Sequence, residues 1–397
     1  MKETMSAVPA VVLGGGVNGL GVIRSLGRHG IPVTLINRNR QDIATRSRYM
    51  TTFIKAPDDP KELIDCLLDL AARCHERQAL FYTSDIFLEI VSQYRDRLAD
   101  HYRFIISDEK SVGIVLGKDA FDRFTAEQGL PAPRGVEVTA ETSISELEDR
   151  LTYPLVVKPQ LSFEWRVARF VDEFGSVKVI RCDTPDEMRD LLPRLRQHTS
   201  RLLVQEAILG EDDAHYSFYS YRSPRFGEIV CLCVNKERIW PIHNGVGSFA
   251  RVVTNAEMCE IGTRLLNTLG WVGVASICFK VERRTGRPMI HEVNGRLPQL
   301  HGVFQAAGVD LPYLMYLDAL DVPLPKMPDR PRSVTYRILS IDGPALLAYR
   351  RDGQLSRLQV LMKALRVDAT AEFGRDDWKP ALMALREAVP SFLRGLL

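Results

Sequence analysis

A strand–glycine turn–helix–strand pattern near the N-terminus restricts the fold of this chain most strongly. An apolar run at residues 10–13 ends in a glycine-rich turn at residues 14–19, and apolar residues at helical spacing follow. A second apolar run occupies residues 31–36. Two strands joined by a helix are parallel neighbours with a right-handed crossover. The pattern therefore predicts a doubly wound α/β domain.

The composition indicates a multidomain globular protein with nearly balanced charge. The chain has 397 residues, which predicts two to three domains at roughly 150 residues each. Lys and Arg number 52 against 50 Asp and Glu, so binding of nucleic acid through bulk charge is excluded. No apolar run reaches the ~20 residues of a membrane span, and we expect no signal peptide. Seven cysteines without a CxxC pair indicate reduced thiols and a cytoplasmic location.

The glycine turn satisfies the GxGxxG pattern with Gly14, Gly16 and Gly19. In one interpretation these glycines let the backbone approach the pyrophosphate of a dinucleotide. That site requires an acidic residue for the ribose after the second strand, where this chain has Asn37 and then Arg38. In the other interpretation the glycines only permit a tight turn. An NAD(P)-dependent oxidoreductase is therefore one alternative function.

Four segments in the middle of the chain place charged residues at the ends of apolar strands or helices. They are a helix that contains Lys118, YPLVVKP at residues 153–159, VQEAILGEDD at residues 204–213, and HEVNGR at residues 291–296 with AAGVDLP at residues 306–312. A lysine that closes an apolar strand, as Lys158 does, is costly to bury unless it meets an anion. The runs at residues 270–280 and 288–296 flank a charged turn and predict an antiparallel hairpin.

In this order and spacing, the four segments resemble the ATP-grasp superfamily and, within it, the carboxylate–amine ligases. The resemblance covers roughly residues 8–320. It implies an α/β protein with a Rossmann-like pre-ATP-grasp domain, an ATP-grasp fold of two α+β subdomains that clamp ATP, and a small C-terminal α/β extension. We expect these parts at residues 1–115, 116–325 and 326–397.

The implied function is ATP- and Mg²⁺-dependent ligation, in which a carboxylate is activated as an acyl phosphate and an amine attacks it. Such an enzyme needs lysines, a divalent metal and acidic metal ligands to hold the polyanionic nucleotide. The expected partners are small-molecule carboxylates and amines, such as amino acids, and a homodimer is left open. ADP and an amide or peptide-like bond are the expected products.

The resemblance also implies roles for residues of the nucleotide site. Lys118 and Lys158 would contact the phosphates of ATP, and Lys158 would also lie near the adenine. The hinge at Gln205, Glu206 and Ile208 would bind the adenine, largely through backbone groups. Each residue also has a simpler interpretation as a solvated residue of a helix start, strand end or turn.

Further residues are implied for the ribose, the metal and the reacting phosphate. Asp212 resembles the ribose ligand, with its neighbour Glu211 as a competing candidate. Glu292 and Asn294 resemble Mg²⁺ ligands, and residues two apart on a strand face the same side. Arg296, next on that face, would steady the γ-phosphate or the acyl phosphate. An exposed polar strand face is the alternative for these three residues.

Two departures from the family pattern bear on activity. Aligning the hairpin strands places Cys278 where the family has an acidic metal ligand, and a thiol is a poor ligand for Mg²⁺. Glu282 is then an alternative ligand, or the site holds fewer metals. The loop at residues 160–169 has no glycine, although Arg166 or Arg169 is available to neutralise phosphate. A catalytically diverged ATP-binding protein is therefore a second alternative function.

The signals for the substrates are fewer. Residues 234–248 resemble the strand and loop that border the acyl-phosphate site, where Lys236 or Arg238 would bind a substrate carboxylate or lie in an ordinary hairpin. Asp85 follows an apolar strand, at the end where α/β folds bind ligands. The basic segment from residue 326 contains amphipathic helix candidates at residues 355–365 and 378–397, for which packing on the protein is expected and membrane contact is not.

Overall fold

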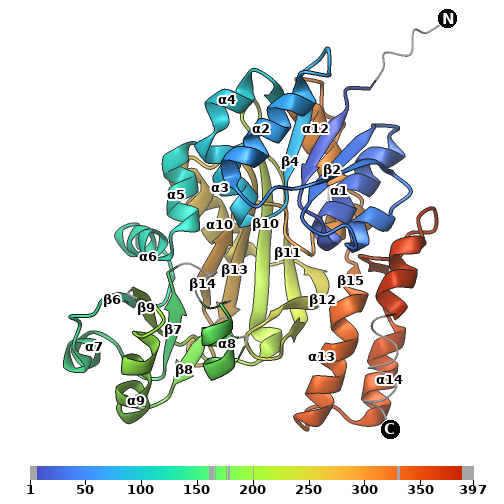
Figure 1. The fold of residues 1–397 in the computed structure, drawn as a ribbon. Helices are drawn as coiled ribbons and strands as arrows, with labels where there is room; N and C mark the ends of the chain where they lie inside the picture. Colours follow the sequence, from blue (N-terminus) through green and yellow to red (C-terminus); the bar gives the residue numbers. More distant parts are fainter. Residues whose placement is uncertain are drawn as a thin grey trace, which may run out of the picture.

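The computed structural model describes residues 7–160, 165, 167–175, 177, 179–199, 201–328 and 331–386. In these ranges the strands form three sheets with helices packed around them (Figure 1). Residues 161–164 and Arg166 of the glycine-free loop at residues 160–169 lie outside the described residues.

The N-terminal sheet confirms the predicted doubly wound domain. Within residues 10–103 its parallel strands follow the order β3-β2-β1-β4-β5. They are β1 Ala10–Leu13, β2 Val33–Asn37, β3 Met50–Lys55, β4 Gln78–Tyr82 and β5 Tyr102–Arg103. The helices of this part are α1 Gly16–Arg28, η1 Ile43–Arg46, α2 Pro60–Ala71, α3 Asp85–Gln93, α4 Arg95–Ala99 and α5 Glu109–Leu116. β1 is fully buried between β2 and β4, and the strand order reverses beside it, which is where such sheets bind ligands.

A smaller antiparallel sheet follows, drawn in green at the lower left of Figure 1. Its described strands, in spatial order, are β6 Gly135–Val138, β9 Leu202–Glu206, β7 Leu155–Pro159 and β8 Ile180–Cys182. The accompanying helices are α6 Lys118–Glu127, α7 Ile144–Arg150, α8 Ala168–Phe174 and α9 Pro185–Leu195. Leu155 and Val157 of β7 enter a core shared with α7 and α9. Because side chains alternate along a strand, Lys158 is turned to the opposite face.

The central sheet contains the predicted hairpin. Its strand order, among the described residues from 215 onward, is β14-β13-β10-β11-β12-β15-β16. The strands before the C-terminal extension are β10 His215–Ser223, β11 Gly227–Trp240, β12 Val246–Val253, β13 Gly273–Val281 and β14 Pro288–Asn294. The helices are η3 Asp212–Ala214, α10 Ala256–Leu269, α11 Gly302–Ala306 and α12 Leu311–Ala319. β13 and β14 pair antiparallel, and Cys278 lies opposite Glu292, as the alignment of the two strands predicts.

The C-terminal extension joins the edge of the central sheet. Its elements are β15 Thr335–Arg337, α13 Leu339–Arg351, α14 Arg357–Leu365 and β16 Ala369–Thr370. β15 pairs with β12, and β16 pairs with β15. A helical segment covers residues 379–386, and the rest of the helix predicted at residues 378–397 lies outside the described residues. The domain limits expected from the sequence stay a prediction, although β15 and β16 belong to the same sheet as β10–β14.

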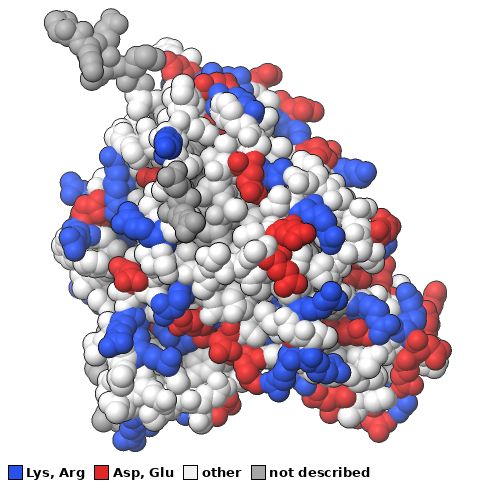
Figure 2. Space-filling view, turned by 180° about the vertical axis from the view of Figure 1, so that it is seen from behind, with Lys and Arg blue, Asp and Glu red and all other residues white. Residues whose placement is uncertain are grey.

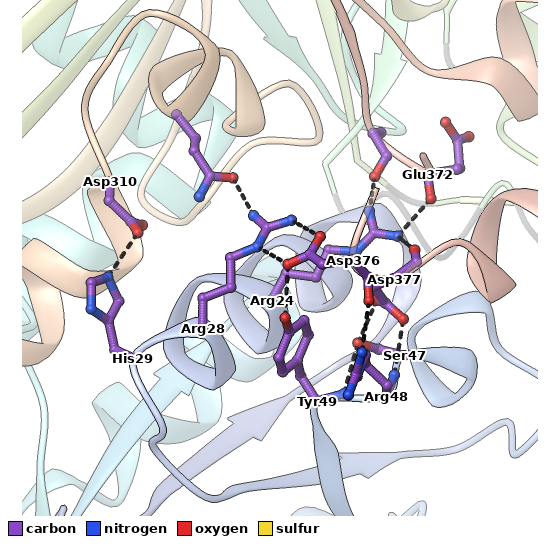
Figure 3. A network of polar contacts seen from close by, with 12 residues as sticks. Arg24, Arg28, His29, Ser47, Arg48, Tyr49, Asp310, Glu372, Asp376 and Asp377 are labelled. Atoms are coloured by element: carbon purple, nitrogen blue, oxygen red, sulfur yellow. Dashed lines mark hydrogen bonds and ion pairs between the residues drawn. The ribbon is translucent and has the colours of Figure 1, made fainter. Parts of the chain in front are cut away.

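The segment after β16 is bound to α1 by two adjacent aspartates (Figure 3). Asp377 is buried and accepts a hydrogen bond from Arg24 at 2.8 Å and from Ser47 at 2.7 Å. Asp376 is more exposed and accepts from Arg28 at 2.7 and 2.8 Å and from Tyr49 at 2.7 Å. These contacts attach the extension to the N-terminal domain.

The contact of Asp376 predicts a pH-dependent contribution to stability. The hydrogen bonds from Arg28 and Tyr49 hold the pKa of Asp376 well below its ordinary value. A carboxyl whose pKa is lower in the folded state stabilises that state above its unfolded pKa and loses this effect as the pH falls. We expect Asp376→Asn to lower the free energy of unfolding at pH 7, and we expect this difference from the wild type to shrink as the pH falls below the ordinary pKa of a carboxyl group. Urea unfolding across this pH range measures the difference, and a difference that grows toward low pH would contradict the assignment.

The surface carries mixed charge. Figure 2 shows Lys and Arg interspersed with Asp and Glu over the face seen there, as the near-balance of 52 and 50 predicts. None of the described helices is both long and apolar enough to cross a lipid bilayer.

Candidate active site

Lys158 on β7 directs its ammonium group toward Gln205 on β9, which in turn contacts α6. Its Nζ donates to Gln205 Oε1 at 2.8 Å, and Gln205 Nε2 donates to Asp122 Oδ1 at 2.6 Å. Burial lowers the pKa of Lys158, while the charges of Glu292 and Asp122 oppose that shift. A half-buried cation in this position favours an anionic ligand.

Lys118 lies beside this group, at the N-terminus of α6. Its Nζ donates to the carbonyl oxygen of Pro159, the residue after Lys158, at 2.6 Å. The structure thus brings together the two lysines expected at the ATP phosphates. The sequence did not point to Asp122, which becomes a neighbour of Gln205 only through packing of α6 on β9.

The hinge after β9 is held by contacts with the segments that precede β6 and β7. Glu206 forms an ion pair with Arg134, and its carboxylate also accepts from the backbone N–H of Thr152 at 2.9 Å. The backbone N–H of Ala207 donates to Pro154 at 2.8 Å. Ile208 follows, half-buried and outside the strands. Binding of adenine by backbone groups of this hinge stays a prediction.

The two ribose candidates lie in different environments. Asp212 is buried in η3, and its Oδ2 accepts from the Tyr349 hydroxyl at 2.7 Å and from the backbone N–H of His243 at 2.8 Å. Glu211 is exposed and forms an ion pair with Arg283. The Asp212 carboxylate therefore binds α13, and the choice between the two residues as ribose ligand stays open.

The candidate metal ligands lie on the hairpin of β13 and β14. Glu292 is exposed and Asn294 is buried, and their Cα partners on β13 are Cys278 and Ser276. Glu292 and Asn294 offer oxygen donors, which are the ligands that Mg²⁺ prefers. Cys278 offers a buried sulfur. Among the described residues, no cluster of three or more His, Cys, Asp and Glu side chains has the arrangement of a metal site.

Glu282 caps the hairpin turn. Its Oε2 accepts from the backbone N–H groups of Arg284 and Thr285, both at 2.9 Å, and its Oε1 lies 3.4 Å from the Arg284 guanidinium. These contacts satisfy the carboxylate within its own turn. They do not favour Glu282 as a metal ligand in place of Cys278.

Arg296 joins the hairpin to the N-terminal domain. Its guanidinium pairs with both carboxylate oxygens of Asp85, at 3.0 and 3.2 Å, and donates to Asn294 Oδ1 at 2.8 Å. Asp85 begins α3 directly after β4, and Asn18 of the glycine turn donates to the carbonyl of Leu297 at 2.7 Å. The end of β14 therefore meets the ligand-binding edge of the N-terminal sheet.

The two cations of β11 have different surroundings. Arg238 is buried and pairs with both oxygens of Asp342 on α13, at 2.7 and 2.8 Å. Its guanidinium also lies 4.1 Å from the centroid of the Phe249 ring. Lys236 instead places its Nζ 3.3 Å from Cys278 Sγ. Of the two candidates for a substrate carboxylate, the structure brings only Lys236 to the hairpin.

Two histidines that the sequence did not single out adjoin this group. The rings of His215 and His291 are 5.7 Å apart in an edge-to-face arrangement. Burial, with the charges of Lys280 and Lys236, lowers the pKa of His215 to about 4. Burial and neighbouring cations also lower the pKa of His291, whose Nε2 has no hydrogen-bond partner among the described residues. In the sequence, the position of His291 next to the candidate metal ligand Glu292 indicated that this histidine lies near the site.

The glycine turn is closed by a carboxylate of the chain itself. Asp42 accepts from the backbone N–H of Gly16 at 2.8 and 3.0 Å. A Cβ on Gly15 would lie 2.5 Å from this carboxylate, and one on Gly19 would lie 2.4 Å from the carbonyl oxygen of Gly14. Asp42 thus takes the position at the start of α1 where a pyrophosphate would bind. The structure favours the tight-turn interpretation over the dinucleotide site.

Comparisons with known proteins agree with this geometry. No protein-family model matches the chain. D-aspartate ligase from Enterococcus faecium is 22% identical over 300 residues, which cover 72% of this chain and 70% of that protein. Formate-dependent phosphoribosylglycinamide formyltransferase from Ignicoccus hospitalis is 24% identical over 343 residues, with coverages of 82% and 79%.

Solved structures give the same result for the fold. N5-carboxyaminoimidazole synthetase from Staphylococcus aureus matches with a TM-score of 0.66 at 14% identity, over 87% of this chain and 85% of that chain. L-amino acid ligase from Bacillus licheniformis matches with a TM-score of 0.62 at 14% identity, over 83% and 80%. These similarities, together with the two further sheets that follow the doubly wound domain, show that the chain has the ATP-grasp fold.

Proposed function

We propose that the protein is an ATP- and Mg²⁺-dependent, ADP-forming carboxylate–amine ligase. The observation that carries this proposal is that Lys236 contacts Cys278 on the β13–β14 hairpin and Lys158 senses the charge of Glu292 there, while Lys118 binds the residue after Lys158. Three cations beside hard oxygen donors suit a metal-bound polyphosphate. The similar proteins include D-aspartate ligase and L-amino acid ligase, which supports amino acids or related small molecules as substrates.

In this proposal Lys118 and Lys158 bind the phosphates of ATP, and Arg296 holds the reacting phosphate. Glu292 and Asn294 would hold Mg²⁺, because a carboxylate and an amide oxygen fit its preference for hard donors. A divalent ion bound there would neutralise phosphate charge. Arg296 is already oriented by Asp85, so it needs little reorganisation to meet an anion.

The reaction proceeds in two displacements. A carboxylate oxygen of the acid substrate attacks the γ-phosphorus, the bond to the β-phosphate oxygen breaks, and ADP leaves. The amine then attacks the carbonyl carbon, phosphate leaves and the amine loses a proton. The domain limits of 1–115, 116–325 and 326–397 are part of the proposal. A cytoplasmic setting is also part of it. The free thiols of Cys233 and Cys259, whose sulfur atoms are 3.5 Å apart, support this setting.

Release of ADP and phosphate with a panel of paired amino acids tests the proposal. We expect turnover by the wild type and a loss of about 100-fold or more in Lys158→Ala, because a positioned cation is removed from the phosphates. Lys61→Ala, an exposed change on α2, serves as the control and is expected to retain full activity. ATP binding without turnover across a broad panel would instead favour a catalytically diverged ATP-binding protein. Thermal stabilisation by NADPH but not by ATP and Mg²⁺ would contradict both.

A further inference from the structure

Lys236 lies at a β-bulge that aims its side chain at the candidate metal site. β11 and β12 change register between Asn235 and Arg238, so two residues of β11 stand opposite one residue of β12. A bulge of this kind redirects a side chain and is common beside active sites. The next residue, Glu237, binds Arg251, while Lys236 Nζ reaches Cys278 Sγ at 3.3 Å.

The aliphatic part of Lys236 is held as well. A Cβ on Gly247 would lie 3.1 Å from Lys236 Cγ and 3.2 Å from its Cδ. Glycine at this position of β12 therefore leaves room for the lysine to cross it. With its stem against Gly247 and its ammonium group against Cys278, the side chain is fixed at both ends.

Cys278 belongs to a row of paired residues that ends at Glu292. Ser217 of β10 pairs with Cys278 of β13, which pairs with Glu292 of β14. The Ser217 hydroxyl oxygen also lies 3.5 Å from Cys278 Sγ. Because directly paired residues present their side chains on one face, the thiol lies between the Lys236 ammonium group and the Glu292 carboxylate.

Among the described residues, this row presents its carboxylate, that of Glu292, at one end, and a thiol and the neutral Ser217 hydroxyl at the other. Glu292 and Asn294 suit one Mg²⁺, since this ion is commonly held by one or two protein oxygens together with phosphate. At the Cys278 side, the described residues present a sulfur, which Mg²⁺ binds poorly, and an ammonium group that repels a second cation. A second divalent ion therefore has no favourable position there.

We propose that Lys236 takes the place of a second divalent ion, so that the site binds one Mg²⁺ and the Lys236 ammonium group supplies the other positive charge to the phosphates. This inference rests on the proposed ligase function. It assigns Cys278 a defined role, because the residue fills this position without offering the Lys236 ammonium group a carboxylate partner. A carboxylate at position 278 would form an ion pair with Lys236 instead.

Counting bound Mn²⁺ by electron paramagnetic resonance, in the presence of the non-hydrolysable ATP analogue AMP-PNP, tests the inference. The wild type and Cys278→Ser are each expected to bind one Mn²⁺ per chain. The double variant Cys278→Asp/Lys236→Met adds a carboxylate and removes the ammonium group, and it is expected to bind two Mn²⁺. Two ions in the wild type, or one in the double variant, would overturn the inference.

Calorimetric binding of AMP-PNP separates this failure from failure of the proposed function. A wild type that does not bind the analogue contradicts the ligase function and this inference together, whereas binding with two Mn²⁺ contradicts the inference alone. We also expect Lys236→Met to lower turnover about 100-fold and Lys236→Arg to stay within about tenfold of the wild type, because arginine keeps the charge. Equal loss in both variants, with unchanged melting temperature, would overturn the role of the charge.

Discussion

Replacing Glu292 by alanine is expected to lower the rate of ADP release about 1,000-fold, because the change removes the one carboxylate of the candidate metal site. Glu282→Ala is expected to stay within about tenfold of the wild type, since that carboxylate is satisfied by its own turn. The two variants remove the same group from the same hairpin, so each serves as the control for the other.

Steady-state release of ADP, measured over a range of Mg²⁺ concentrations, checks whether Glu292→Ala loses more activity than Glu282→Ala. Glu292→Ala is expected to remain folded, because Glu292 is exposed. Its melting temperature without nucleotide should match that of the wild type. A larger loss of turnover in Glu282→Ala than in Glu292→Ala would show that the metal ligands are assigned wrongly.

Replacing Arg24 by methionine is expected to lower the free energy of unfolding by about 3–5 kcal/mol, because it leaves the buried carboxylate of Asp377 without its cation. Arg24 is 5% exposed and Asp377 is 2% exposed. The guanidinium also donates to the carbonyl oxygens of Ala371, Glu372 and Asp377, at 2.6 to 2.7 Å. Its loss therefore removes most of the bonds that hold the extension on α1 (Figure 3).

Urea denaturation of Arg24→Met and Arg28→Met checks this prediction with a matched pair on one helix. Arg28 forms a similar ion pair with Asp376, but that pair is partly exposed. We expect its loss to cost about 1 kcal/mol or less. Equal costs for the two variants would contradict the account in which burial makes the Arg24–Asp377 pair the main attachment of the extension.

Local patterns predicted the elements that position the site. The β1–α1–β2 unit, the hairpin and the pairing of Cys278 with Glu292 each depend on residues close together in the sequence. The same is true of Lys158, which alternation along β7 places on the face opposite the core. In these cases strand or helix periodicity decides where a side chain points.

Contacts between distant segments could not be predicted in this way. Arg238 and Asp342 are 104 residues apart in the sequence, and Lys236 and Cys278 are 42 apart. No periodicity connects such residues, because their meeting depends on how whole strands and helices pack. The Lys236 contact additionally requires a bulge, for which β11 has no recognisable sequence signal.

Glu282 lies at a position where the sequence also favours a turn. Its carboxylate accepts from the N–H groups two and three residues later, which is the local bonding of a turn. A glutamate at the start of a charged turn therefore has a nearby use that competes with binding a metal. The turn hydrogen bonds, and not the strand face that Glu282 shares with Cys278, determine where its carboxylate lies.

Transfer of ¹⁸O from a labelled carboxylate to phosphate tests the central claim most directly. If the acid substrate attacks the γ-phosphorus and the amine then displaces phosphate, one carboxylate oxygen leaves with the phosphate. Mass spectrometry of the released phosphate is therefore expected to show one ¹⁸O atom for each molecule formed together with ADP. Unlabelled phosphate, or release of AMP and pyrophosphate, would contradict ligation through an acyl phosphate.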